Sequence, residues 1–135
     1  MLTNKISLAI ITFNRDFSIL TRLLNSINSH CSINQIHSIE IVLNDHAKWF
    51  HHLELIVNNF STLPITCHNA NDIFNGFNAF NWNTQQYFKC KISDFIKTDW
   101  YMILDSKDCF VENVDFFKDY LTHDNKAVMP VIESP

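Results

Sequence analysis

The feature that most constrains the fold is an alternation between short apolar segments and longer segments with helical spacing. Residues 5–12 read KISLAIIT, a nearly continuous apolar run rich in isoleucine, as is typical of a strand buried on both faces. Residues 16–29 follow as a predicted helix with a single apolar stripe. Its members are Phe17, Leu20, Leu24 and Ile27.

The same alternation continues along the chain. We predict further strands at 38–43, 64–68 and 100–104, further helices at 49–60, 84–96 and 114–121, and a candidate edge strand at 127–131. The segment 69–83, which holds the only glycine, is predicted to be a long ordered loop. Strands and helices that alternate in this way predict an α/β fold with a mostly parallel, Rossmann-like sheet flanked by helices.

Length and composition predict one globular domain over residues 1–135. The chain has 135 residues, of which 47% are hydrophobic, enough to form a packed core. The net charge is -4, and Lys and Arg are scattered singly, so nucleic acid is not an expected partner. The longest early apolar run is too short to span a membrane, and we expect a cytoplasmic protein.

The four cysteines lie far apart without a Cys-x-x-Cys pair. This spacing favours free thiols over a disulfide framework or a zinc ribbon. The histidines near them lack the spacing of zinc ligands on one face of an element, so no zinc site is expected.

Polar clusters follow three of the predicted strands: 12–15 (TFNR), 44–46 (NDH) and 105–108 (DSKD). In open parallel sheets, ligands bind beyond the carboxyl ends of the strands, so these clusters are expected to converge. They offer an aromatic ring for a base, carboxylates for ribose or a divalent cation, and cations for a diphosphate. The chain cannot form a glycine-rich phosphate loop, because it has one glycine.

Three stretches carry a resemblance to known families. Residues 10–27 (IITFNRDFSILTRLLNSI) and 39–45 (IEIVLND) resemble the first two strands of the large inverting family of nucleotide-sugar glycosyltransferases. Residues 83–111 are similar to a less characterised glycosyltransferase-like family with Gln-Gln-x-x-Lys on a helix and Leu-Asp-x-Lys-Asn after the next strand. The resemblance implies a glycosyltransferase A fold, truncated at its C-terminus, that binds a nucleotide-diphosphate sugar.

The resemblance also implies roles for individual residues. Thr12 and Phe13, with the adjoining Asn14 and Arg15, would meet the nucleoside, and Asp45 its base or ribose. On the helix before the last strand, sugar or phosphate contact and a solvated helix face remain equal alternatives. The residues concerned there are Gln85, Gln86 and Lys89.

The last strand ends in a variant of the family's Asp-x-Asp motif. Asp105 matches the first Asp, Lys107 replaces the second, and Asp108 follows it. Mn²⁺ or Mg²⁺ could bind Asp105 and Asp108, because these ions prefer oxygen ligands. Alternatively, Asp105 begins an Asx-type turn. Lysine cannot ligate a metal, but its ammonium can lie against a diphosphate.

Two functional hypotheses remain open. The first is a glycosyltransferase with an unknown acceptor, or the nucleotide-binding half of one, completed by a partner domain or a second copy. The second is a catalytically inactive domain that binds a nucleotide or a protein. An exposed apolar patch over the last strand would favour a missing half or an oligomer. Large aromatic residues usually pack in the core, and we expect this of Trp82, Trp100 and Tyr101.

Overall fold

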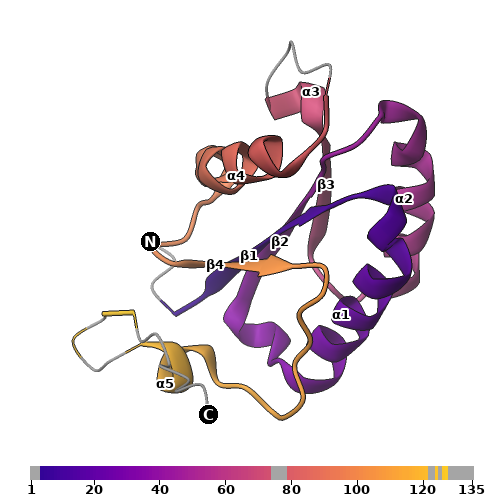
Figure 1. Cartoon of the computed structure of the whole chain (residues 1–135). Coiled ribbons are helices and arrows are strands. Elements are labelled where there is room, and N and C mark those ends of the chain that lie inside the picture. Colours follow the sequence, from indigo (N-terminus) through magenta and orange to yellow (C-terminus); the bar gives the residue numbers. More distant parts are fainter. Residues whose placement is uncertain (1–3, 74–78, 122–123, 125, 128–135) are drawn as a thin grey trace, which may run out of the picture.

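The computed structural model describes residues 4–73, 79–121, 124 and 126–127, and it has an α/β fold (Figure 1). Four strands form one sheet in the order β3-β2-β1-β4, and every pair of neighbours is parallel. The strands are β1 (Ile6–Thr12), β2 (Ile36–Leu43), β3 (Ile65–Asn69) and β4 (Tyr101–Asp105). The predicted fold class is confirmed, and each strand lies within two residues of its predicted position.

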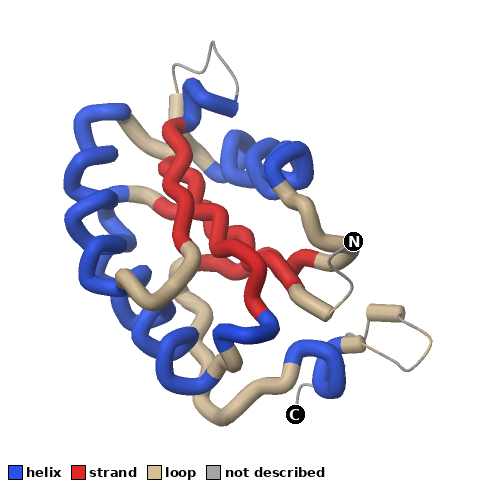
Figure 2. Tube along the Cα trace, turned by 180° about the vertical axis from the view of Figure 1, so that it is seen from behind, coloured by secondary structure: helices blue, strands red, loops and turns tan. Residues whose placement is uncertain are grey.

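Helices cover both faces of the sheet. The α-helices are α1 (Phe17–His30), α2 (Phe50–Val57), α3 (Ala70–Ile73), α4 (Trp82–Lys91) and α5 (Phe116–Tyr120). Figure 1 shows α1 and α2 on one side of the sheet and α4 on the other, and Figure 2 shows the same layers from behind.

The alternation of side chains along β1 explains these two layers. All seven residues of β1 are buried. Leu8 and Ile10 join the larger core cluster, which includes the apolar stripe of α1. Ala9 and Ile11 point to the other face and join a smaller cluster with Phe88 of α4. A strand covered on both faces is mostly apolar, which is the pattern that predicted it, and the buried hydroxyl groups of Ser7 and Thr12 have hydrogen-bond partners.

The predicted helices differ from the observed ones mainly at their ends. The segment predicted as one helix over 49–60 is α2 with a short 3₁₀ helix at each end, Ala47–Trp49 and Asn58–Phe60. Helix ends often tighten in this way, and Asn58 and Asn59 have low α-helix propensity. The segment predicted at 84–96 is α4 followed by a 3₁₀ helix, Ile92–Phe95.

The segment 69–83, predicted to be a loop, contains the short helix α3 and the beginning of α4. Residues 74–78 of that prediction lie outside the described residues. So do residues 128–131 of the candidate edge strand, although Ala127 forms an isolated antiparallel bridge with Leu121.

The prediction that Trp82 belongs to the core is wrong, because its side chain is 69% exposed. Trp82 lies six positions before the buried Phe88, which places it about 120° away around the helix axis. Trp100 and Tyr101 do pack against the core clusters, as predicted.

The cysteines are free, as predicted, with Cys31 buried and Cys90 and Cys109 exposed. Within the described part of the chain, no helix combines the length and apolar character that crossing a membrane requires.

Candidate functional site

The carboxyl ends of β1, β2 and β4 meet at one edge of the sheet. Thr12 lies beside Leu43 in the β1–β2 register, and Ile11 lies beside Asp105 in the β1–β4 register. The polar residues that follow these strands are therefore brought together, as the parallel sheet predicted.

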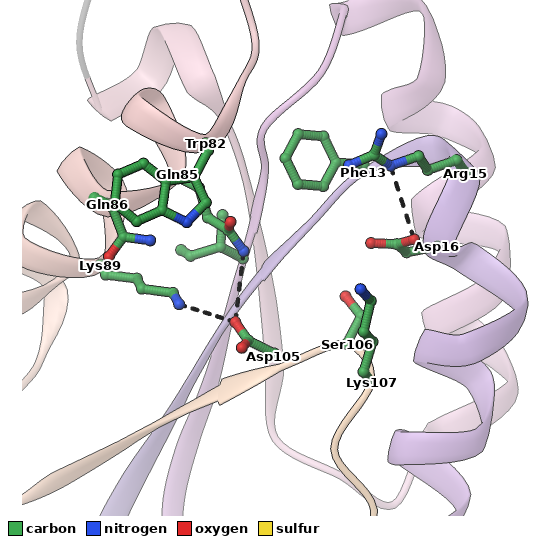
Figure 3. Close-up of a pocket in the computed structure, with 11 residues that line it drawn as sticks. Phe13, Arg15, Asp16, Trp82, Gln85, Gln86, Lys89, Asp105, Ser106 and Lys107 are labelled. Atoms are coloured by element: carbon green, nitrogen blue, oxygen red, sulfur yellow. Dashed lines mark hydrogen bonds and ion pairs between the residues drawn. The ribbon is translucent and has the colours of Figure 1, made fainter.

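A cavity of about 240 Å³ opens at this edge, and we call it the strand-end pocket (Figure 3). Residues of α4 form one wall, the segment after β1 forms the opposite wall, and the end of β4 lies between them. The lining residues are Ile11, Phe13, Arg15, Asp16, Trp82, Gln85, Gln86, Lys89, Asp105, Ser106 and Lys107.

Two side chains of α4 contact the Asp105 carboxylate in the pocket. Lys89 Nζ lies 2.9 Å from Asp105 Oδ1, and Gln85 Nε2 donates to the same oxygen at 3.5 Å (Figure 3). The Lys89 side chain is 21% exposed and that of Asp105 is 50% exposed. The ammonium group of Lys89 is thus partly buried and points toward the end of β4.

The turn after β4 uses Asp108 in a different way. Asp108 Oδ2 accepts from the backbone N of Asp105 at 2.8 Å, and Asp108 N donates to the carbonyl O of Asp105 at 2.9 Å. Asp108 lines a separate groove, the β4 groove, and is not among the residues that line the strand-end pocket. The β4 groove is formed by Met102, Ile103, Leu104, Asp108, Cys109, Phe110 and Tyr120.

The two residues between these carboxylates have fixed backbones. Ser106 is 2% exposed, and its hydroxyl donates to Thr12 Oγ1 at 3.0 Å, which joins the end of β4 to the end of β1. The carbonyl O of Lys107 accepts from Arg22 Nη2 of α1 at 3.1 Å. The exposed Lys107 side chain therefore projects into the pocket from an anchored position.

A second cavity of about 430 Å³, the Asp45 groove, adjoins the pocket. The two share Phe13, Arg15 and Trp82, and the groove is completed by Asn14, Asp45, Phe80 and Asn81. The Arg15 guanidinium lies 4.8 Å from the centre of the Phe13 ring, in a cation–π contact. The shared wall is therefore aromatic and carries a positive charge.

Asp45 ties together the ends of two strands. Its Oδ2 accepts from Asn14 N at 3.0 Å, and its Oδ1 accepts from His46 N at 2.8 Å. The carboxylate thus fixes the segment after β1 relative to the segment after β2.

Helix α4 is positioned by a polar contact at its beginning and an apolar contact along its length. Asn81 and Thr84 form a capping box, and the Thr84 hydroxyl also lies 2.9 Å from Oδ1 of Asn44, which is fully buried after β2. Phe88 and Ile92 are fully buried against the sheet. Together these contacts fix the helix whose next turn carries Gln85, Gln86 and Lys89.

The structure groups most of the predicted site residues. Phe13, Arg15, Gln85, Gln86, Lys89, Asp105 and Lys107 line the strand-end pocket, and Asn14 and Asp45 line the Asp45 groove. Thr12 is fully buried and lines neither cavity. The two predicted metal ligands, Asp105 and Asp108, face different cavities.

Sequence reasoning missed several lining residues: Asp16, Phe80, Asn81, Trp82 and Ser106. Asp16 and Ser106 follow directly on predicted site residues, so sequence proximity could have suggested them. Asn81 could have been suggested by its spacing of three residues from Thr84, which is typical of a helix start.

A comparison with protein families gives one match, a family of unknown function, DUF6492, over residues 3–134. The chain belongs to DUF6492. No functionally curated protein matches this DUF6492 member. The finer sequence resemblance, to a family with a Gln-Gln-x-x-Lys helix, stays a prediction.

Among solved structures, the DUF6492 chain is similar to part of the crystal structure of S. aureus TarS, with a TM-score of 0.57 and 14% sequence identity. The match covers 85% of this chain and 18% of the TarS chain. This similarity shows a glycosyltransferase-like fold. Because the chain spans less than a fifth of TarS, the similarity shows the fold alone.

Proposed function

We propose that the chain binds a nucleotide-diphosphate sugar across the strand-end pocket and the Asp45 groove, as the donor half of a glycosyltransferase. The observation that carries the proposal is the convergence of three strand ends and one face of α4 on two cavities that share a wall. An elongated ligand with a base, a diphosphate and a sugar matches two adjoining cavities better than one. Ligand sites commonly occupy about 300–1,000 Å³, and the two cavities together reach this range.

The chemistry of the two cavities supports an orientation for the ligand. In the Asp45 groove, the rings of Phe13 and Phe80 suit a nucleobase, and the Asp45 carboxylate suits base or ribose donors. In the strand-end pocket, Lys89 and Lys107 suit the diphosphate. The amides of Gln85 and Gln86 suit sugar hydroxyl groups.

In the proposed transfer, the bond between the anomeric carbon and the diphosphate oxygen breaks, and its electron pair stays on the diphosphate. A new bond joins the anomeric carbon to an acceptor oxygen, and the acceptor proton passes to a general base. We assign no base among the described residues. Of the two carboxylates that line the pocket, Asp105 is paired with Lys89, and Asp16 lies 4.0 Å from Arg15.

Binding without turnover is the second candidate function. The pairing of Asp105 with Lys89 and of Asp16 with Arg15 favours it, because neither carboxylate is left as a general base. The β4 groove bears on the same question, because Ile103 of β4 is 40% exposed beside it. This exposed apolar surface supports the proposal that the acceptor half comes from a partner domain or a second copy. The cytoplasmic location stays a prediction.

The test is a thermal-shift panel of UDP-, GDP-, CMP- and dTDP-sugars, each with EDTA and with Mn²⁺. A ligand at about 100 times its Kd adds about 2.7 kcal/mol to the free energy of unfolding. We expect at least one donor to raise the melting temperature, and Trp82→Ala to reduce that rise. The matched control is Leu55→Ala, since Leu55 is also an exposed apolar side chain but lines neither cavity.

If no donor shifts the melting temperature in either buffer, the nucleotide-sugar proposal is wrong. For a donor that binds, we would follow release of the free nucleotide over time, which is a nucleoside diphosphate for UDP-, GDP- and dTDP-sugars and CMP for CMP-sugars. Release favours a transferase, and binding without release favours either the donor half alone or the inactive domain.

A further inference from the structure

The strand-end pocket has the wrong carboxylate geometry for the divalent cation that its fold family implies. Such ions need several converging oxygen ligands and usually bridge one or two carboxylates to substrate phosphates. Asp108 supplies no oxygen ligand in the pocket, because its Oδ2 accepts from Asp105 N at 2.8 Å and its side chain lines the β4 groove. Only one of the two expected carboxylates therefore faces the ligand.

Both carboxylates that line the pocket already have a cation beside them, since Asp16 lies 4.0 Å from Arg15 and Asp105 is paired with Lys89. Lys89 Nζ lies 2.9 Å from Asp105 Oδ1, within the pocket. A metal at this oxygen would meet a positive charge at close range, in a half-buried place where charges interact more strongly than in water. Nor does any group of three or more His, Cys, Asp or Glu side chains suit a metal ion within the described residues.

The pocket nevertheless has the charge that a diphosphate needs. Its lining includes three cationic side chains, Arg15, Lys89 and Lys107, and two carboxylates, Asp16 and Asp105. The whole chain, in contrast, has a net charge of -4. The lining of the pocket thus has one more cation than carboxylates, although the chain as a whole is negative.

The two lysines stand on opposite sides of Asp105. Figure 3 shows Lys89 reaching in from α4 and Lys107 rising from the turn after β4. Both come from anchored backbone, because α4 is fixed by its buried Phe88 and the carbonyl O of Lys107 accepts from Arg22. An ammonium acts as a compact point charge that can follow a phosphate oxygen.

We infer that the pocket holds a diphosphate between the ammonium groups of Lys89 and Lys107 and does so without a divalent cation. This inference rests on the proposed function, since it concerns the diphosphate of the same ligand. On binding, Lys89 exchanges its contact with Asp105 for a phosphate oxygen. Asp105 is then free to accept from a hydroxyl group of the ribose or the sugar.

The experiment is isothermal titration of the chain with UDP, GDP, dTDP and inorganic pyrophosphate, each in EDTA and in Mn²⁺. For a probe that binds, we expect binding in EDTA to be at least as tight as in Mn²⁺, because Mn²⁺ also binds the phosphate oxygens of the free probe. Charge-assisted hydrogen bonds contribute about 1.5–3 kcal/mol, so Lys89→Gln and Lys107→Gln should each weaken binding about tenfold or more. Lys97→Gln is the matched control, because Lys97 is exposed and outside the pocket.

Asp108→Asn tests the metal alternative without removing the turn, because the Asn side-chain oxygen can still accept from Asp105 N. We expect this variant to keep the Kd of the unchanged chain in both buffers. Binding that requires Mn²⁺ and is lost in Asp108→Asn would overturn the metal-free inference and leave the proposed function standing. Absence of binding by every probe and every nucleotide sugar in both buffers would overturn the proposed function, and this inference with it.

Discussion

The hydroxyl group of Thr84 offers the sharpest test of how the site is assembled. It lies 2.9 Å from Asn44 Oδ1 and accepts from Asn81 N at 2.9 Å, so it joins the beginning of α4 to the end of β2. Thr84→Val keeps the shape of the side chain and removes both contacts, together with the 2.8 Å hydrogen bond from the hydroxyl to the carbonyl O of Asn81. The variant should fold and should be less stable.

The expected loss follows from the two groups that lose their partner. Asn44 is fully buried, and leaving a buried acceptor unsatisfied costs about 1–3 kcal/mol. Loss of half of the capping box adds about 0.5–1 kcal/mol. The free energy of unfolding should therefore fall by about 1.5–4 kcal/mol, and the melting temperature by about 5 °C or more.

The assay is urea unfolding followed by circular dichroism, with Thr84→Ser as the matched control. Serine keeps the hydroxyl and loses one methyl group, so its cost should be about 1 kcal/mol. If Thr84→Val proves as stable as Thr84→Ser, the hydroxyl does not carry the link between α4 and β2, and the reasoning fails.

Three further predictions concern the core and the cysteines. Phe88→Ala should cost about 3–5 kcal/mol and Phe88→Leu much less, measured by urea unfolding, because Phe88 is fully buried between α4 and the sheet; equal costs would contradict this packing. A thiol reagent at pH 8 should label the exposed Cys90 and Cys109 quickly, the partly buried Cys67 more slowly, and Cys31 only on unfolding, as peptide mapping can show. Burial raises the pKa of Cys31 and Cys67 from 9.0 to about 12. Since the unfolded chain then binds fewer protons between these values, the free energy of unfolding should fall as the pH rises above 9. Replacing both residues with alanine should remove that part of the pH dependence.

The layered fold could be predicted from the sequence because burial leaves a local pattern. Residues 5–12 are apolar at most positions, and every residue of β1 is buried because both faces of the strand are covered. Parallel pairing of the strands was then enough to predict that Asp45 and Asp105 lie at the same edge of the sheet. Such features depend on which face of an element is covered, and hydrophobic spacing records this directly.

Other features depend on contacts between distant segments, which spacing does not record. Asn81 begins α4, but it lies in a stretch with many asparagines, and its partner Thr84 is fixed by Asn44 from another strand. The sequence suggests that Asp108 is a metal ligand. In the structure, its carboxylate accepts a hydrogen bond from Asp105 N, and the side chain lines the β4 groove instead of the strand-end pocket. Polar side chains near a strand end can be predicted, but the cavity that each one faces cannot.

The position of β4 in the sheet has a consequence for the stiffness of the site. β1 is paired on both sides, whereas β4 is paired with β1 alone within the described residues. Edge strands open locally at a lower free energy than central ones, so amide hydrogens of β4 should exchange faster than those of β1. The pocket thus has one wall after a central strand and Asp105 at the end of a strand on the edge of the described sheet. A bound ligand should therefore slow hydrogen exchange most at β4 and leave β1 almost unchanged.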